Sequence, residues 1–434
     1  MNIVQITPGA GGMYCGNCFR DNALVAALRR EGHETLMVPL YLPMALDEEN
    51  QSAGTPIFFG GVSVYLEQKS ALFRHAPRWL HQLLASPRLL KWAAGRAAKT
   101  RAEDVGDLTL SMLRGENGHQ ARELAALIAW LKTQPRPDVI CLSNALLLGL
   151  AKQLKRELGA TVVCMLQGED TFLDALGPAH REPAWQLLSE RAADADVFIA
   201  PSRYFGERMR ERMKLPAGRL RVVFNGINLD GYAPVSGAVH PPVLGFFARQ
   251  CREKGLDTLV EAFLLLKERP GCKELRLHVG GGCGPGDEAF VHSLKLRLEE
   301  REVLDHVKFF PNVDRTGKLE FFRTLSVFSV PALYGEAFGL YVIEALAAGV
   351  PVVQPRVASF PELIVATGGG LLCDPGNPKA LATAIETLVV HPLNARHLGQ
   401  RGQQVVRDRF NVEKMARDMV AVFEETTRRS RKNQ

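Results

Sequence analysis

An apolar strand, a loop with two glycines and a helix follow one another between residues 326 and 353, and this unit restricts the folds open to the chain. Ser326 to Val330 is typical of a short buried strand, and the Ala- and Leu-rich run Val342 to Ala348 predicts a helix that ends at Gly349. A loop that leads from a strand to a helix N-terminus is the usual geometry for holding a phosphate. Similar alternation of strands and helices elsewhere in the chain predicts the α/β class.

Two carboxylates flank the start of this predicted helix. Glu336 lies in the loop before the helix, and Glu344 lies within it. Carboxylates bind sugar hydroxyls well because each accepts strong hydrogen bonds. The stretch therefore has the groups to hold a phosphate and two sets of hydroxyls, which is the combination that a nucleotide-sugar offers. The alternative is a helix packed on a sheet with two solvated glutamates.

At these residues the sequence resembles the retaining nucleotide-sugar glycosyltransferases of family 4 (glycosyltransferase group 1). The residues that carry the resemblance are Glu336, Phe338-Gly339-Leu340, Glu344-Ala345, Ala347, Gly349 and Pro351-Val352-Val353. The resemblance implies the GT-B fold, in which two Rossmann-like α/β domains face each other across a cleft. It also implies a hexosyltransferase-type enzyme (EC 2.4) that retains the anomeric configuration and needs neither a metal nor a cofactor. The family's retaining step is generally discussed as a front-face attack in which the leaving phosphate takes the acceptor proton.

The resemblance also assigns roles to individual residues. Glu336 would hold the hydroxyls of the donor sugar, the amides of Phe338, Gly339 and Leu340 would contact the sugar or the diphosphate, and Glu344 would hold the ribose hydroxyls.

Upstream, Arg249 and Lys254 match the family's pair of cations beside the donor diphosphate. Two fixed cations would stabilise the negative charge that develops on the leaving diphosphate. The alternative is a pair of surface cations.

The N-terminal half opens with a second candidate ligand loop. The strand Asn2 to Ile6 leads into Gly11 and Gly12, and a helix from Asn22 to Arg30 follows. Glycines there let the backbone approach a ligand closely, and the resemblance places a glycine pair at this point, facing the donor phosphates and the acceptor. The alternative is a tight turn without a ligand.

Gln167 and Asp170 follow the buried strand Thr161 to Leu166. Many family members have a histidine where Gln167 stands. A glutamine forms hydrogen bonds with sugar hydroxyls but serves as neither an acid nor a base. Asp170 would contact the acceptor or cap a helix N-terminus.

Two short motifs have a structural and a chemical interpretation. Cys15 and Cys18 form CGNC, and packing at the start of the first helix is favoured over a redox or metal site. Asp194 and Asp196 form a DxD before the strand Val197 to Ala200. Ligands of such sheets lie after strands, which favours a turn between a helix and a strand.

The length of 434 residues predicts two domains. We expect an N-terminal acceptor domain at 1–233 with a helical insert at 66–115, a donor domain at 234–410, and a final helix at 411–434 that crosses back to the first domain. Gly231 to Val243, rich in Gly, Pro and Ala, is expected to be the linker.

The net charge of +6 suits an anionic ligand, and no nucleic-acid-binding motif is found. The N-terminus has neither the charged lead nor the apolar run of a signal peptide. The eight cysteines suggest a reducing compartment, and we expect a cytoplasmic protein. Leu66 to Arg101 is basic with interleaved aromatics. Two interpretations of it are open: peripheral contact with an anionic membrane at its inner face, or a helical insert that covers its own domain.

The expected partners are a nucleotide-sugar and a glycan, lipid or small-molecule acceptor. The motifs name neither the donor base nor the acceptor. Two alternative functions use the same scaffold: a nucleotide-sugar epimerase, and a non-catalytic protein that binds glycans or nucleotide-sugars.

Overall fold

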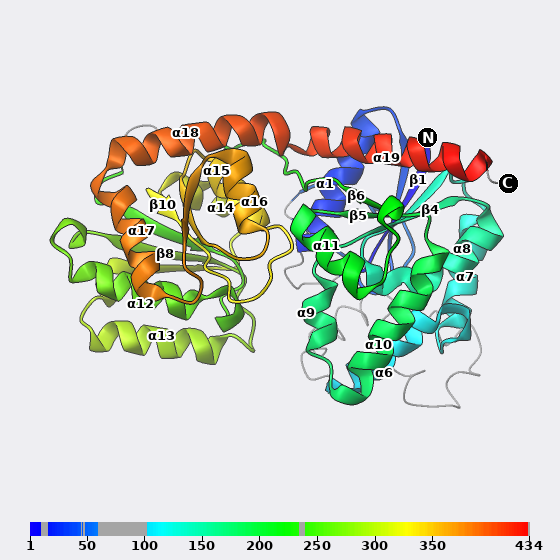
Figure 1. Cartoon of the computed structure of the whole chain (residues 1–434), viewed down its shortest axis with the longest axis horizontal. Helices are drawn as coiled ribbons and strands as arrows, with labels where there is room; N and C mark the ends of the chain where they lie inside the picture. The colour runs from blue at the N-terminus through cyan, green and yellow to red at the C-terminus, as the bar shows by residue number, and fades with distance from the viewer. Residues whose placement is uncertain (10–15, 45, 47, 60–101, 234–238, 433–434) are drawn as a thin grey trace. The chain divides into compact units, whose positions relative to one another are not determined.

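The computed structural model describes residues 1–9, 16–44, 46, 48–59, 102–233 and 239–432 (Figure 1). The chain divides into two compact units. The N-terminal unit comprises Met1–Phe224 and Met415–Gln434, and the C-terminal unit comprises Asn225–Lys414. Within the described ranges, no helix combines the length and the apolar character that a membrane crossing requires.

The N-terminal unit is built on a parallel six-stranded sheet with the order β2-β1-β3-β4-β5-β6. Its strands are β1 (Asn2–Thr7), β2 (Glu34–Pro39), β3 (Val139–Leu142), β4 (Thr161–Met165), β5 (Val197–Ala200) and β6 (Leu220–Val222). All residues of β3, β4 and β5 are buried, as expected for parallel strands that helices cover on both faces.

The helices of this unit follow the strands in sequence. They are α1 (Gly16–Arg30), α6 (Ala102–Arg114), α7 (Ala121–Leu131), α8 (Ala151–Leu158), α9 (Glu169–Asp174), α10 (Pro178–Arg191), α11 (Arg203–Arg212) and α19 (Val412–Lys432), whose first residues belong to the C-terminal unit. Short 3-10 helices are η2 (Gly115–Asn117), η3 (Ala145–Leu150), η4 (Ala192–Asp194) and η5 (Ala217–Arg219).

The C-terminal unit has a second parallel sheet, with the order β12-β11-β10-β7-β8-β9. Its strands are β7 (Val243–Phe247), β8 (Arg276–Gly281), β9 (Val307–Pro311), β10 (Val327–Phe328), β11 (Val352–Pro355) and β12 (Gly370–Cys373). The chain builds outward from β7 to β9 and then returns to place β10 on the other side of β7. The reversal between β7 and β10 is where ligands bind in open α/β sheets, at the carboxyl ends of the strands.

The helices described in this second unit follow its strands in sequence. They are α12 (Leu256–Lys267), α13 (Glu288–Glu300), α14 (Arg315–Arg323), α15 (Leu340–Ala347), α16 (Phe360–Thr367), α17 (Pro378–Val390) and α18 (Pro392–Arg409). The short 3-10 helices described there are η6 (Arg252–Lys254), η7 (Pro270–Cys272) and η8 (Leu304–His306).

The predicted fold class, two Rossmann-like α/β units, is confirmed by the two parallel sheets. Local boundaries differ from the predictions in several places. Helix α1 begins at Gly16 rather than at Asn22, and α15 begins at Leu340 rather than at Val342. Before α8 the chain forms the 3-10 helix η3. The side chain of Asn144 accepts the amide of Leu146 and so starts the 3-10 segment.

The segment expected to link the domains, Gly231 to Val243, falls within the C-terminal unit. Tyr232 is 7% exposed, and its ring packs 6.3 Å from the ring of Phe322, centroid to centroid. The compact units divide at Phe224 and Met415, whereas the sequence placed the boundaries at 233 and 410. The acceptor and donor roles of the two domains stay predictions. The basic stretch 66–101 lies outside the residues that the structure describes.

Candidate active site

The loops that follow β7 and β10 meet at the reversal of strand order in the C-terminal unit. Gly255 lies at the end of the loop after β7, with φ of 74°, and a Cβ there would lie 2.0 Å from the carbonyl oxygen of Pro331. Only glycine allows this approach, since it has no Cβ and adopts positive φ readily. The amide of Leu333 also donates to the carbonyl of Glu253, at 3.0 Å. Backbone packing thus fixes the two loops to each other.

Lys254 and Glu336 form an ion pair between these loops. The Lys254 Nζ lies 2.6 Å from Glu336 Oε2, and the two side chains are 18% and 15% exposed. The hydroxyls of Tyr341 and Tyr334 donate to the same oxygen, at 2.8 and 3.4 Å. The ammonium group also lies over both tyrosine rings, 4.9 Å from the centroid of Tyr334 and 5.3 Å from that of Tyr341. These contacts hold the cation and the carboxylate in fixed positions.

The pair remains ionised despite its burial. Burial raises the pKa of Glu336, but the Lys254 charge and the hydrogen bonds outweigh it and hold that pKa below its ordinary value. Burial lowers the pKa of Lys254, and the charge of Glu336 outweighs it and holds that pKa above its ordinary value. The pKa of Tyr334 is raised to about 12, first by burial and then by the Glu336 charge, so its hydroxyl stays a donor.

Glu336 keeps one oxygen open. All three hydrogen bonds go to Oε2. Within the described ranges, no group donates to Oε1. A carboxylate with one oxygen saturated and the other open accepts a hydroxyl of a bound sugar in a fixed direction.

The residues between Glu336 and α15 form a tight turn. Gly339 has φ of 93°, which favours glycine, and the Ser359 hydroxyl donates to the carbonyl of Phe338 at 2.9 Å. The amides of Gly339 and Leu340 donate to no group in the part of the chain that the structure describes. At the start of α15 these amides present the positive end of the helix dipole, which suits a phosphate or sugar oxygen.

Glu344 lies on α15 and is buried, at 8% exposure. Its Oε1 accepts from Lys318 Nζ at 3.1 Å and from the Tyr232 hydroxyl at 3.3 Å. Both partners hold the carboxylate in place. Its Oε2 accepts from no group in the described ranges.

Arg249 has a partner that the sequence did not predict. Its guanidinium forms two parallel hydrogen bonds with Asp287, which precedes α13: Nε lies 3.0 Å from Oδ2, and Nη2 lies 2.9 Å from Oδ1. The hydrogen bonds to Asp287 raise the pKa of Arg249 above its ordinary value. The arginine side chain is 63% exposed and Asp287 only 7%, so a buried carboxylate orients an exposed cation.

The structure describes only some of the site residues predicted in the N-terminal unit. Gly11, Gly12 and Cys15 lie outside the described residues. The amide of Gln167 donates to Glu169 Oε2 at 2.8 Å. Asp170 is 1% exposed and forms an ion pair with Arg208, within α9 rather than at its N-cap.

Glu169 was not singled out by the sequence, and it connects two strand exits. Its Oε1 accepts the amide of Ala145 at 2.7 Å, while Oε2 accepts that of Gln167. Burial raises the pKa of this carboxyl, and the two backbone donors oppose the shift. The carboxylate therefore ties the loop after β3 to the loop after β4.

The described residues of the two ambiguous motifs make structural contacts. Cys18 is buried against Val25, Met37 and Met44, in agreement with the packing interpretation. Asp194 pairs with Arg191 before β5, at 3.3 Å. No group of three or more His, Cys, Asp and Glu side chains able to hold a metal ion occurs in the described ranges.

The partners missed by the sequence analysis are Tyr334, Tyr341, Asp287, Lys318 and Tyr232. The two tyrosines lie within seven residues of each other on either side of Glu336, so the sequence could have indicated them as hydrogen-bond donors to that carboxylate. Asp287 and Lys318 lie far from their partners in sequence, so no local pattern could connect them.

Two family models match the chain in succession. The model described as "Glycosyltransferase Family 4" matches residues 92–230, and the model described as "Glycosyl transferases group 1" matches residues 235–405. The second match contains all the residues of the site in the C-terminal unit except Tyr232.

Curated relatives match over part of their length. The D-inositol 3-phosphate glycosyltransferase of Xylanimonas cellulosilytica is 28% identical over 57% of this chain and 62% of its own. That of Streptomyces avermitilis is 30% identical over 50% of each chain. The phosphatidyl-myo-inositol mannosyltransferase of Mycobacterium leprae is 29% identical over 46% of this chain and 52% of its own. The chain thus spans between half and two thirds of the length of these relatives.

Solved structures resemble the whole chain at low identity. Sucrose-phosphate synthase from Thermosynechococcus elongatus has a TM-score of 0.70 and 23% identity, with 98% of both chains covered. Anabaena HepE in complex with UDP has a TM-score of 0.68 and 17% identity, with 98% of this chain and 100% of that one covered. At these identities the likeness shows a shared fold.

Proposed function

Because this chain belongs to the group 1 glycosyltransferases of family 4, we propose that it transfers a sugar from a nucleoside-diphosphate donor to an acceptor hydroxyl. The observation that carries the proposal is the buried Lys254–Glu336 pair at the reversal between β7 and β10. It combines a fixed cation for a phosphate with a carboxylate whose free oxygen accepts a sugar hydroxyl. A purely structural pair would have no need for such an open acceptor at the ligand-binding edge of the sheet.

The donor would span the site from Glu336 to Glu344. Glu336 Oε1 would accept a hydroxyl of the sugar, and the amides of residues 338–340 would donate to the sugar or the diphosphate. Lys254 and Arg249 would neutralise the diphosphate. Glu344, held by Lys318 and Tyr232, would accept the ribose hydroxyls through Oε2.

The chemistry needs charge stabilisation more than a protein nucleophile. The bond between the anomeric carbon and the diphosphate oxygen breaks, the acceptor oxygen bonds to the same carbon on the same face, and the acceptor proton passes to the leaving phosphate. Lys254 is protonated throughout, since its pKa is raised, and it stabilises the charge that grows on the diphosphate. Because Glu336 is ionised and hydrogen-bonded, it positions the sugar and does not act as the acid.

The N-terminal unit would supply the acceptor site, with Gln167 as a candidate contact. Asp170, which is buried and paired with Arg208, would stabilise the loop instead. The curated relatives carry names that include D-inositol 3-phosphate and phosphatidyl-myo-inositol, so hydroxyl-rich phosphorylated acceptors are a first choice for assay. HepE was solved with UDP and with UDP-glucose, which makes uridine nucleotides the first donors to test. The protein would act in the cytoplasm.

A thermal-shift screen of nucleoside diphosphates and nucleotide-sugars tests donor binding. A bound ligand stabilises the native state by RT ln(1 + [L]/Kd), so about a hundredfold excess over Kd gives about 2.7 kcal/mol. We expect one base to stabilise the wild type and the Lys254→Ala variant to lose most of the effect. The absence of any stabilisation across the panel would refute the proposed donor site.

Product analysis separates transfer from the alternatives. Transfer gives a nucleoside diphosphate and a new glycoside with the anomeric configuration of the donor, as read by NMR. A free epimer would identify an epimerase, and binding without turnover would identify a binding protein. EDTA should leave turnover unchanged, and strict metal dependence would contradict the metal-independent mechanism.

A further inference from the structure

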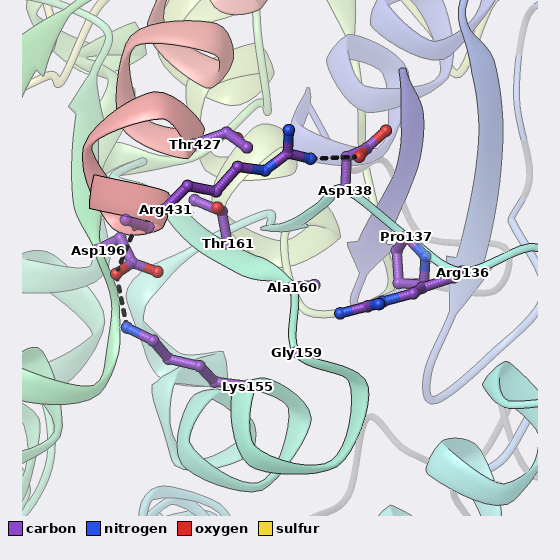
Figure 2. A pocket seen from close by; sticks show the side chains of 11 residues that line it. Arg136, Pro137, Asp138, Lys155, Gly159, Ala160, Thr161, Asp196, Thr427 and Arg431 are labelled. Carbon is purple, nitrogen blue, oxygen red and sulfur yellow. Dashed lines mark hydrogen bonds and ion pairs between the residues drawn. The ribbon is translucent and has the colours of Figure 1, made fainter. Parts of the chain in front are cut away.

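A polar cavity of about 280 Å³ lies in the N-terminal unit, at the amino ends of its strands (Figure 2). The residues just before β3, at the start of β4 and just before β5 form one side of it, and the last turns of α19 form another. The predicted acceptor residues follow β4, at the opposite edge of the same sheet. The cavity is therefore separate from the predicted acceptor residues, and its lining includes none of the predicted donor-site residues.

Two ion pairs border the cavity. Lys155 Nζ lies 2.5 Å from Asp196 Oδ1, and Arg431 Nη2 lies 3.4 Å from Asp138 Oδ1. Figure 2 shows one pair on each side of the open space. Asp196 is the second carboxylate of the DxD motif, which the proposed function does not use.

Both carboxylates are fully engaged in structural contacts. Asp138 Oδ2 accepts the amide of Asn2 at 2.9 Å, and Asp196 Oδ2 accepts the amide of Val162 at 2.8 Å. Each acid thus uses one oxygen to fix the start of a strand and the other to hold a cation. Because their oxygens are occupied, these acids orient the cations and leave the remaining donors for a ligand.

Arg136 brings a third positive charge. In the part of the chain that the structure describes, its guanidinium pairs with no carboxylate and donates no hydrogen bond. It lies against Gly159, where a Cβ would approach Arg136 Nη2 to 2.8 Å. Figure 2 shows the side chain reaching along the cavity below Ala160. The C-terminal end of α8 attracts this cation, but none of its carbonyls accepts a hydrogen bond from it.

Thr427 supplies a buried group without a partner. It is 9% exposed, it borders the cavity, and its Oγ1 forms no hydrogen bond within the described ranges. Its neighbour Thr426, by contrast, donates to the carbonyl of Val422 at 2.7 Å. The Thr427 Oγ1 is not accessible from the cavity, so the residue forms part of the cavity wall and the cations are left to contact a ligand.

We propose that this cavity binds a phosphate group. Three cations face two carboxylates that already accept hydrogen bonds, so one positive charge is left for an anion. A planar guanidinium binds phosphate through two parallel hydrogen bonds, in a bidentate geometry. The volume is close to the lower limit of ligand pockets and suits a phosphate with few additional atoms. The bound group would connect α19 with the starts of the strands.

The test compares sodium phosphate with sodium chloride at equal ionic strength, by calorimetric titration of the full chain. Phosphate also suits the proposed donor site, so the readout is the part of the binding that depends on Arg136. The Arg136→Gln variant should bind at this site roughly tenfold more weakly or worse, as expected for the loss of charge-assisted hydrogen bonds. Arg114→Gln, which removes an exposed cation elsewhere in the unit, is the matched control and should bind as the wild type does.

Thr427→Val is a second control. It should bind phosphate as the wild type does, because the hydroxyl is not accessible from the cavity. Equal phosphate binding by Arg136→Gln and Arg114→Gln would overturn the proposal, as would a wild type that binds no phosphate.

Binding to lipid vesicles distinguishes a phosphate that belongs to a lipid headgroup from one that belongs to a soluble ligand. Arg136-dependent sedimentation with phosphatidylglycerol vesicles, competed by free phosphate, would assign the site to a lipid headgroup. Phosphate binding without such sedimentation would assign it to a soluble phosphate ligand. The inference does not depend on the proposed transferase activity, because neither measurement requires turnover.

Discussion

Replacing Lys254 with Met tests whether the pair with Glu336 is both structural and functional. Both side chains are more than four-fifths buried, and removal of one partner of a buried ion pair costs about 3–5 kcal/mol. The remaining carboxylate keeps the Tyr341 and Tyr334 hydroxyls, so we expect the lower end, about 3 kcal/mol in the free energy of unfolding.

Turnover should fall more steeply than stability. Loss of one preorganised charge donor at a reacting group typically lowers kcat by about 10²–10³. Urea unfolding and release of nucleoside diphosphate from the donor are the two assays. Arg252→Met is the matched control, since that side chain is 72% exposed and should change unfolding by about 0.5 kcal/mol or less.

The double variant Lys254→Met/Glu336→Gln completes the cycle. It removes both charges, so it should be more stable than the sum of the two single variants predicts, by about 1–3 kcal/mol. Its turnover should not recover, because the phosphate contact and the sugar contact are both altered. Strictly additive stability effects, or near wild-type turnover in a folded Lys254→Met protein, would refute the reasoning.

Other parts of the C-terminal unit give independent checks. Burial lowers the pKa of His278 to about 4, below its ordinary value of 6.5. The neutral ring therefore contributes about 3 kcal/mol to the free energy of unfolding above pH 6.5, and this contribution is lost as the pH falls through 4. In urea unfolding, His278→Leu should flatten this loss of stability at acid pH. Gly255→Ala should destabilise by about 3 kcal/mol, because its Cβ would meet the Pro331 carbonyl at positive φ, and a wild-type melting curve would contradict this. Ser359→Ala should cost about 1 kcal/mol by removing the hydrogen bond to Phe338, measured by denaturation.

Element type and order could be predicted from the sequence because buried parallel strands are short apolar runs between helical patterns. The strand Val197–Ala200 was predicted to the residue, and the strand predicted from Thr161 to Leu166 ends one residue earlier, at Met165. Helix starts were less accurate, as at Gly16, where no capping residue marks the first turn. The helix Pro392–Arg409 was missed, since its glycines and polar residues weaken the helical pattern.

The site was predicted as separate residues rather than as contacts. Glu336 and Lys254 were selected for different roles, and the structure shows that they form one ion pair. The partner of Arg249 is Asp287, which follows a different strand, and only the sheet topology brings the two loops together. Side-chain direction at the end of a strand depends on loop geometry, which a local pattern does not specify.

Hydrolysis of the donor without an acceptor is the most direct test of the proposed donor site around Glu336. Wild type and Glu336→Gln are incubated with a panel of uridine, guanosine, adenosine and thymidine diphosphate sugars, and release of the nucleoside diphosphate is followed by chromatography. We expect slow release from one class of donor by the wild type. In Glu336→Gln, checked for the wild-type fold by circular dichroism, release should fall by about a hundredfold. Release by neither protein from any donor, or equal release by both, would contradict it.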